Sequence, residues 1–334
     1  MVVQRTCDDR SATRNDVAQL AGVSAAVVSY VVNNGPRPVS EATRKRVLDA
    51  IDKLGYRPNA PARWLTKGRA ELIALIVPDL QNPYFAALAH AVESAAHGRG
   101  MGLILTQSHG TWTPQMVDAL SGLMVSGIIS ASLPTAAGVR ALVNQPASVV
   151  VLSLAGSFGP FPAVWPDFQA GSREAVRHLV VDHGHTEVAL VTGTEEGDDD
   201  QRERAWLDVL TEHGLSPSAV IRTPWSMRGG RDAAELLRRR HPQVTAAFVT
   251  SDQQAVGLLA GLHAAGVSVP TDLAVASFDD SPEAAFTIPT LTTVGPSLAT
   301  MATDAVAAVL GAATECRSPY PTQLTIRESC GCRA

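Results

Sequence analysis

The sequence predicts a small all-α head, with a helix-turn-helix and a hinge helix, followed by a two-lobed α/β domain with parallel sheets. Three observations predict this organisation: two short helical patterns flank a glycine near the start, strand-like and helical patterns alternate after Glu71, and the net charge changes sign between these parts. We expect the head over residues 12–58, the hinge helix and linker over 59–70, and the two-lobed domain over 71–334.

The stretch 12–34 has the spacing of two helices joined by a tight turn. Gly22 interrupts the first helical pattern, and Ser24 is placed to cap the second. Small residues at the crossing let the helices approach closely, so the second helix can enter a DNA groove. An ordinary helical hairpin has the same spacing, so the neighbouring segments must distinguish a helix-turn-helix from a hairpin in a core. The expected inward residues are Val17, Ala18, Leu20, Ala21, Val28, Val31 and Val32, and the expected outward residues are Ala25, Ala26, Ser29 and Tyr30.

A third helix is expected after Ser40, which is placed as its cap. A short helical segment then starts at Pro58 and Asn59. Apolar residues at helical spacing give the third helix one face, made of Val47, Ala50, Ile51 and Leu54.

Four motifs follow one another between Thr13 and Arg69: D-V-A-x-x-A-G-V-S, V-V-N, V-S-x-x-T-R and G-Y-R-P-N. In this order and spacing they resemble the DNA-binding head and hinge of the lactose/galactose repressor (LacI/GalR) family. The resemblance implies a symmetric homodimer on an inverted-repeat operator of double-stranded DNA. It implies phosphate contacts by Thr13, Ser24, Ser29, Asn33, Ser40 and Thr43, base contacts by Ala25, Ala26 and Tyr30, and hinge contacts by Asn59, Ala62 and the minor-groove wedge Leu65.

The distribution of charge supports this reading of the head. Residues 1–69 hold 12 Lys or Arg against six Asp or Glu, whereas the remainder holds 15 against 26, so net charges of +6 and −11 make up the total of −5. A basic head attracts the phosphate backbone and an acidic body is repelled by it. An isolated charge run is usually a solvated face, but this one coincides with the helix-turn-helix.

Alternating strand-like and helical segments after Glu71 predict parallel sheets covered on both faces. The resemblance implies a pair of lobes like those of periplasmic sugar-binding proteins, with an effector site in the cleft between them. We expect the first lobe over about 71–167 and 296–319, and the second over about 168–295 and 320–329. The chain should cross between lobes near 166–170, near 293–296 and close to Pro319.

Residues that directly follow strands are candidates for binding the effector, because ligands of open parallel sheets lie beyond the carboxyl ends of the strands. Carboxylates and arginine bind hydroxyl groups, and an aromatic face stacks on a sugar ring. Core packing for Phe85, helix capping for Asp167 and lobe capping for Trp225 are the structural alternatives. The candidates, taken from positions that match the family's motifs, are Tyr84, Phe85, Asp167, Arg202, Trp225, Asp252 and Asp279.

Other polar clusters receive structural interpretations. The acidic run 195–200 is expected to be a solvated loop, and His183 and His185 to flank a turn at Gly184. Cys330 and Cys332 lack the second ligand pair of a zinc site, so we assign no metal and no cofactor.

The sequence distinguishes between three classes of function: a ligand-controlled transcription factor, a sugar-binding transport protein and a sugar-converting enzyme. A transport protein with the same lobes requires a signal peptide and no DNA-binding head. An enzyme requires catalytic residues, and the sequence has no nucleotide-binding, nucleophile-elbow or zinc-protease motif. No stretch approaches the length of a membrane span, so we expect a cytoplasmic, nucleoid-associated regulator. A sugar is the expected effector and a purine the alternative.

Overall fold

The computed structural model describes residues 12–33, 35, 37–57, 69–108, 112–132, 136–143, 147–152, 161–217, 219–312 and 319–332. The chain divides into two compact units, residues 1–68 and 69–334. The predicted hinge therefore lies almost entirely outside the described residues, since only Arg69 and Ala70 of the range 59–70 are described.

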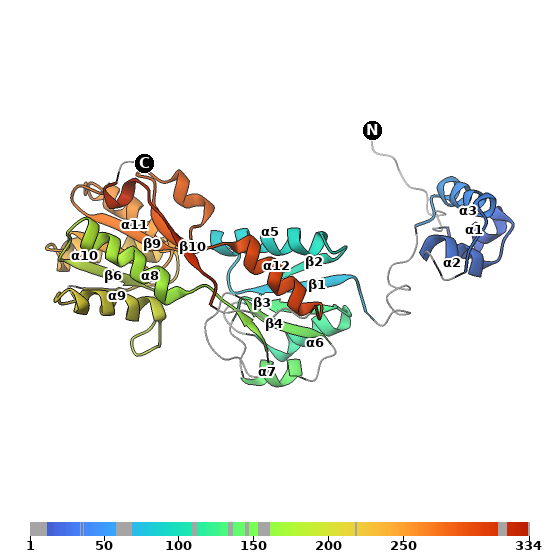
Figure 1. Cartoon of the computed structure of the whole chain (residues 1–334), viewed down its shortest axis with the longest axis horizontal. Coiled ribbons are helices and arrows are strands. Elements are labelled where there is room, and N and C mark those ends of the chain that lie inside the picture. Colours follow the sequence, from blue (N-terminus) through green and yellow to red (C-terminus); the bar gives the residue numbers. More distant parts are fainter. Residues whose placement is uncertain are drawn as a thin grey trace. The chain divides into compact units, whose positions relative to one another are not determined.

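The head contains three helices, α1 (Arg14–Ala21), α2 (Ala25–Asn33) and α3 (Glu41–Leu54) (Figure 1). Thr13 and Asp16 form a capping box at the start of α1, and Gly22 ends the helix in the left-handed conformation. The axes of α1 and α2 are bent by 104°, within the range of helix-turn-helix motifs. The buried core of the head consists of Val17, Ala18, Ala21, Val28, Val31, Val47 and Ala50.

Two residues expected on the apolar faces of the head are exposed instead, Leu20 and Leu54. Leu54 is the last residue of α3, and the chain turns back after it: the Tyr56 amide donates to the Ile51 carbonyl, and Tyr56 packs against the core. This turn is a Schellman motif, which brings the residue after the helix into contact with its last turn. Tyr56 therefore packs against the core of the head, whereas Leu54 is exposed.

In the described residues, no single helix is long and apolar enough to span a membrane. Only α1 and α2 together, across their bend, pass a test of length and composition.

The first sheet of the larger unit is parallel, with the strand order β2-β1-β3-β4-β5 (Figure 1). Successive residues of β1 point to opposite faces: Ile73 and Leu75 pack with the helices α5 and α12, whereas Ala74 and Ile76 pack with α6. The elements are β1 (Leu72–Val77), α5 (Pro83–His97), β2 (Gly102–Gln107), α6 (Pro114–Gly122), β3 (Gly127–Ser130), α7 (Ala136–Val143), β4 (Ser148–Leu152), β5 (Ala163–Val164) and α12 (Leu298–Val309).

The second sheet has the order β11-β10-β9-β8-β6-β7, in which only β11 is antiparallel to its neighbour. Its interior strands read as continuous apolar runs because both of their faces are covered, for example Val188–Thr192. The elements are α8 (Phe168–Arg177), the π-helix η1 (His178–Asp182), β6 (Val188–Thr192), α9 (Gln201–Glu212), β7 (Val220–Arg222), α10 (Met227–Arg240), β8 (Ala246–Val249), α11 (Asp252–Ala264), β9 (Ala274–Phe278), η2 (Pro282–Phe286), β10 (Thr292–Pro296), β11 (Thr322–Thr325) and η3 (Glu328–Cys330).

The sequence predicts helices over 114–125 and 168–182 and parallel sheets, and three details differ. The first of these helices ends at Gly122, the second changes to a π-helix at His178, and the last strand joins the sheet in antiparallel orientation. The antiparallel strand follows from the connection, because α12 packs on the first sheet before the chain returns to pair with β10. Periodicity alone reports neither the change to a π-helix nor the orientation of the last strand.

Helices α10 and α11 pack against each other through glycines. A Cβ atom at Gly257 would lie 1.8 Å from the Met227 carbonyl oxygen, and one at Gly230 would lie 1.8 Å from the Gln254 carbonyl oxygen. The Gln254 side-chain amide also donates to the Thr223 and Pro224 carbonyls, in the segment before α10. This contact fixes the start of α10, and with it the preceding Trp225.

We expect Gly257→Ala to lower the free energy of unfolding by about 3 kcal/mol, because the methyl group meets backbone that cannot move without separating the two helices. Urea denaturation followed by circular dichroism measures the change. Gly122→Ala is the matched control: no atom lies within 4 Å of the added Cβ, so stability should stay within about 0.5 kcal/mol of the parent. Equal stability of the two variants would contradict the close packing of α10 and α11.

Candidate functional site

The candidate DNA-contacting residues lie at helix starts and on the second helix of the head. Thr13 and Ser40 accept hydrogen bonds from backbone amides at the starts of α1 and α3, and Ser24 does so at the start of α2. Thr43 hydrogen-bonds to Ser40, with 2.9 Å between their hydroxyl oxygens. These hydroxyls therefore sit at three helix N-termini, where backbone amides and the helix dipole favour phosphate.

On α2, Ser29, Tyr30 and Asn33 are all at least partly exposed. The Asn33 side-chain amide donates to the Ser29 hydroxyl at 3.1 Å. Ala26 is exposed, but Ala25 packs partly against the core of the head, so it offers less surface than the sequence suggested. Asn59, Ala62 and Leu65 lie outside the described residues.

The effector candidates of the second sheet gather at its topological switch point. The chain leaves β6 toward β7 on one side and continues through β8 to β9 and β10 on the other. Ligands of open α/β sheets bind beyond the carboxyl ends of the strands at such a point. Thr192 ends β6, Thr250 follows β8, and Asp279 follows β9.

Arg202 is held at this point by its own helix and by the neighbouring strand. Its Nε and Nη2 donate to the two carboxylate oxygens of Asp200 at 3.1 and 3.0 Å, and its Nη1 donates to the Thr250 carbonyl at 3.0 Å. Burial disfavours the charge of Asp200, but the Arg202 charge and hydrogen bonds prevail and lower the Asp200 pKa to about 2. The ion pair therefore stays charged throughout the physiological range.

Two aromatic rings border the Arg202 guanidinium. Its Cζ lies 5.1 Å from the centre of the Phe168 ring and 4.8 Å from that of Trp225, which are cation–π distances. The Trp225 indole also lies against Gly193, where a Cβ atom would be only 2.4 Å away. Trp225 remains 37% exposed, so part of its surface is available for stacking.

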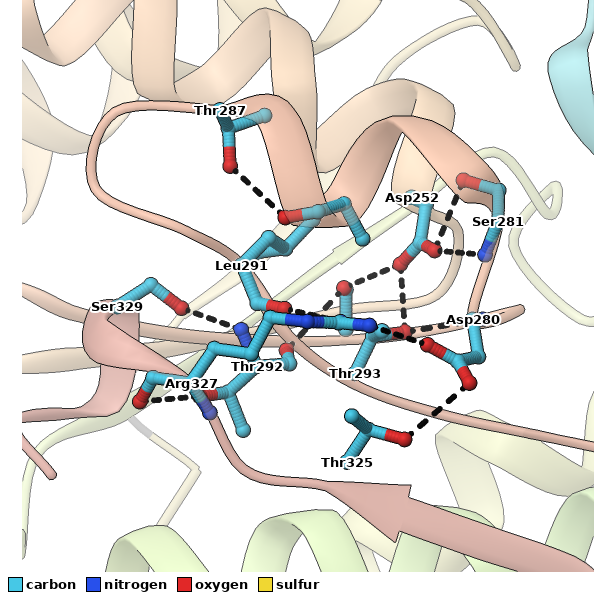
Figure 2. Close-up of polar contacts among 12 residues, drawn as sticks. Asp252, Asp280, Ser281, Thr287, Leu291, Thr292, Thr293, Thr325, Arg327 and Ser329 are labelled. Carbon is cyan, nitrogen blue, oxygen red and sulfur yellow. Dashed lines mark hydrogen bonds and ion pairs between the residues drawn. The ribbon is translucent and has the colours of Figure 1, made fainter. Parts of the chain in front are cut away.

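Asp252 differs from Arg202 because its carboxylate is fully used within the protein (Figure 2). One oxygen accepts from the hydroxyls of Ser277 and Thr293, and the other accepts from the backbone amide and hydroxyl of Ser281. The side chain is completely buried, and burial raises its pKa. This geometry favours a role for Asp252 in positioning strand ends over direct contact with an effector.

Asp279 occupies a strained backbone position beside this network. Its φ is +126°, and that of Asp280 is +49°, conformations that cost energy for residues with a side chain. Asp280 accepts hydrogen bonds from Arg327 and Thr325, which hold the turn (Figure 2). Burial and the charge of Asp252 raise the Asp279 pKa well above its usual value, and Arg202 opposes the shift.

In the described part of the chain, Asp279 accepts a single long hydrogen bond, of 3.4 Å, from the Asp252 amide. Among the described residues, Arg202 likewise has two guanidinium N–H groups, of its five, that make no hydrogen bond. Arg202 therefore keeps donors, and Asp279 keeps acceptors, that a third group can use.

The candidates of the first lobe also have structural roles. Tyr84 is buried in the core and meets Phe85 edge-on, with 5.3 Å between the ring centres. Phe85 is partly buried and packs against the same core. Asp167 accepts from the Ala170 amide at 2.8 Å and so caps α8, which is the alternative that the sequence left open. Tyr84 and Phe85 follow β1, which lies beside the switch point of the first sheet.

Sequence reasoning missed three residues of this site: Asp200, Phe168 and Thr250. Asp200 was assigned to a solvated acidic run, but it is buried and paired with Arg202, because it caps α9 two residues before the arginine. That capping position was the available signal. For Phe168 and Thr250, the contact with Arg202 depends on the packing of distant segments.

Comparison with known proteins identifies the two parts of the chain. Residues 13–59 match the model of bacterial regulatory proteins of the lacI family, and residues 176–330 match that of a periplasmic binding protein-like domain. The chain is 34% identical to catabolite control protein A of Priestia megaterium over 84% of this chain and 86% of that protein. It is 31% identical to the transcriptional regulator GalR of Salmonella typhimurium, over 94% of this chain and 93% of that protein.

Solved structures agree with the sequence relatives. A lac repressor dimer bound to operator and an anti-inducer superposes with a TM-score of 0.83 and 26% identity, covering 96% of this chain and 99% of that one. A LacI family regulator from Lactobacillus casei with bound sucrose superposes with a TM-score of 0.67 and 28% identity, covering 77% of this chain and 99% of that one. The chain belongs to the LacI family of bacterial transcriptional regulators and is not an enzyme.

Proposed function

We propose that this protein is a repressor that binds an inverted-repeat operator as a homodimer and is controlled by a sugar or sugar-like effector. The predicted boundaries, 12–58 for the DNA-binding head, 59–70 for the hinge and 71–334 for the two-lobed effector domain, are part of this proposal. DNA binding by a dimer is supported by relatives that are named as regulators and by the likeness to an operator-bound lac repressor dimer. In this role the protein acts in the cytoplasm, on the nucleoid.

The observation that best supports the effector site is the way in which the Arg202 side chain is held. Its position is set by Asp200, Thr250 and two aromatic rings. Among the described residues, two of its N–H groups make no hydrogen bond, and its charge acts on Asp279. A pre-positioned donor and acceptor bind neighbouring hydroxyl groups with little loss of side-chain entropy. The partly exposed face of Trp225 suits the apolar face of a sugar ring. Sugar-bound relatives of the same fold support this assignment.

A purine is the second candidate effector. Phe168 and Trp225 both lie close to Arg202, and aromatic rings stack on a planar base as well as on a pyranose. A base would use the Asp279 carboxylate as an acceptor for a ring or amino N–H. A thermal-shift screen with sugars, sugar phosphates and purines distinguishes the two classes, since only a bound compound raises the unfolding midpoint.

Operator binding depends on α2 and on the hinge. Ala26 can offer only a methyl contact to thymine, and Tyr30 offers a hydroxyl and a ring edge, so the base preference should differ from that of relatives with larger polar residues there. A change in lobe closure would alter the spacing of the two hinges in the dimer. A coupling of a few kcal/mol is sufficient to switch operator binding.

We expect Arg202→Lys and Asp279→Asn each to raise the effector concentration for half-maximal response at least about 10-fold, while the operator affinity of the free protein stays unchanged. Lysine keeps the charge but loses the planar fork, and asparagine replaces an acceptor with a donor. Fluorescence anisotropy with labelled operator DNA measures both quantities.

The matched control is Arg204→Gln, which removes an exposed arginine of the same helix that pairs with Asp199 on the surface. Its response should stay within about twofold of the parent, because an exposed ion pair contributes little. A normal response in Arg202→Lys, in protein with a normal unfolding midpoint, would remove Arg202 from the effector site.

We expect Leu65→Ala to weaken binding to the operator at least about 10-fold more than binding to random DNA, because the side chain is proposed to wedge into the central base step. Gel-shift titrations at one fixed salt concentration compare the two DNAs. Equal losses on both would contradict the wedge.

We expect two chains per particle in dilute solution, because a symmetric dimer presents one head to each half-site of an inverted repeat. Multi-angle light scattering measures the mass directly. A mass of four chains would contradict the proposed assembly, and a mass of one chain at DNA-binding concentrations would contradict the symmetric operator.

A further inference from the structure

Four side chains with metal-ligand chemistry converge where η1 meets η3 and the residues that follow each of them. His178 and His183 come from η1 and the residue after it, and Cys330 and Cys332 come from the last turn of the described chain. Their four ligand atoms lie within 4.8 Å of one another. We call these residues the Cys2His2 cluster; the sequence alone had offered no second ligand pair for the two cysteines.

The π-helix is what brings the two histidines together. In an α-helix, residues five apart point about 140° away from each other. Here the His183 amide donates to the His178 carbonyl five residues earlier, and the two imidazole ring centres lie 4.7 Å apart. π-helical turns are rare, and they are found frequently at functional sites.

A tight turn brings the two cysteines together. Gly331 lies between them with φ at +106°, a conformation that L side chains rarely adopt. The turn passes directly beside one of the histidines, since a Cβ atom at Gly331 would lie 3.4 Å from the His183 ring. The turn thus directs Cys330 and Cys332 toward the same pair of histidines.

Hydrogen bonds alone do not account for this arrangement. The Nδ1 of His178 lies 2.8 Å from the Asp182 carboxylate and therefore carries a proton. Three ligand atoms surround the other nitrogen, Nε2: His183 Nε2 at 3.2 Å, Cys330 Sγ at 3.3 Å and Cys332 Sγ at 3.7 Å. A single lone pair, or a single N–H, can serve only one of them.

Four of the six distances between ligand atoms, 3.2 to 3.7 Å, are close to the edges of a tetrahedron around one ion, and the other two are at most 4.8 Å. Zinc–nitrogen and zinc–sulfur bonds of about 2.05 and 2.3 Å require nitrogen–nitrogen edges of about 3.3 Å and nitrogen–sulfur edges of about 3.6 Å. The histidine nitrogens are 3.2 Å apart, and Cys332 Sγ lies 3.4 Å from His183 Nε2. Two thiolates and two imidazoles form a donor set that zinc prefers.

We propose that the Cys2His2 cluster binds one structural Zn²⁺ ion through His178 Nε2, His183 Nε2, Cys330 Sγ and Cys332 Sγ. Both thiols lose their protons to solvent on binding, so a neutral four-ligand complex forms without any redox step. Asp182 orients His178 from behind, as carboxylates do for many zinc-bound histidines. The Thr292 hydroxyl donates to Cys330 Sγ at 3.1 Å and stabilises its thiolate.

The ion would fasten the end of the chain to the second lobe. Cys330 lies beside Thr292 of β10, and the next residue of that strand, Thr293, donates to Asp252. The Ser329 hydroxyl donates to the Val275 carbonyl of β9. Zinc would therefore link η1 to the turn that holds the two cysteines, behind the strands that carry the effector candidates. Its four protein ligands would leave no coordination position for a substrate.

The test uses the full chain purified without a histidine tag from zinc-supplemented medium. We expect about one zinc per chain by plasma mass spectrometry, and a fall to below about one tenth in Cys332→Ser. After zinc removal, cobalt(II) alone should give the visible bands of a tetrahedral ion and a thiolate charge-transfer band. A strong chelator should lower the unfolding midpoint by about 5 °C, and added zinc should restore it.

His185→Gln is the matched control. This neighbouring histidine hydrogen-bonds to Thr245 and lies outside the cluster, so its variant should keep zinc and the cobalt spectrum. The metal content and the cobalt spectrum of the parent protein do not depend on any variant folding. A parent protein without zinc and without tetrahedral cobalt bands would overturn the proposal, as would thiol titration showing Cys330 and Cys332 joined in a disulfide.

Discussion

The ion pair between Arg202 and Asp200 is the interaction on which the candidate effector site depends. A carboxylate buried at the start of α9 needs a partner, and the bidentate guanidinium supplies it with two hydrogen bonds. The same pairing fixes the guanidinium plane against Phe168 and Trp225. The arginine is therefore oriented by groups that the ligand does not provide, which lowers the entropy lost on binding.

A second layer of buried polar groups supports this arrangement from behind. Asp252 holds Ser277, Thr293 and Ser281, which belong to β9, β10 and the turn before η2. Removing its carboxylate would leave several buried donors without acceptors, so this network specifies one arrangement of the strand ends. The strained turn at Asp279 and Asp280 persists because Arg327 and Thr325 hold it from β11 and the residues after it.

The antiparallel strand β11 gives the end of the chain a direct role in this architecture. It pairs with β10, the strand whose threonines contact both Asp252 and Cys330. Adjacent residues of a strand point to opposite faces, so Thr293 faces the carboxylate network while Thr292 faces the Cys2His2 cluster. Anything that fixes or releases the terminal turn therefore acts on the strand that supports the effector candidates.

Local signals in the sequence were sufficient for the elements and for the family. Capping residues such as Ser24 and Ser40 located the starts of two head helices, and the alternation of strand-like and helical segments predicted parallel sheets, because these signals depend on near neighbours. The order and spacing of the motifs in the head are sufficient to indicate the family. The position of Asp279 after a strand followed from the same local signals, whereas Arg202 and Trp225 were assigned from the motifs of the family.

Tertiary structure decided which of these side chains share a site and which are used internally. It paired Asp200 with Arg202, enclosed Asp252 in hydrogen bonds, and packed Tyr56 against the core of the head while leaving Leu54 exposed. It also brought His178 and His183 to two cysteines about 150 residues later, through a π-helical turn that no periodicity reports. Contacts between distant segments depend on sheet order and on the path of the last strand, and neither is recorded in the spacing of neighbouring residues.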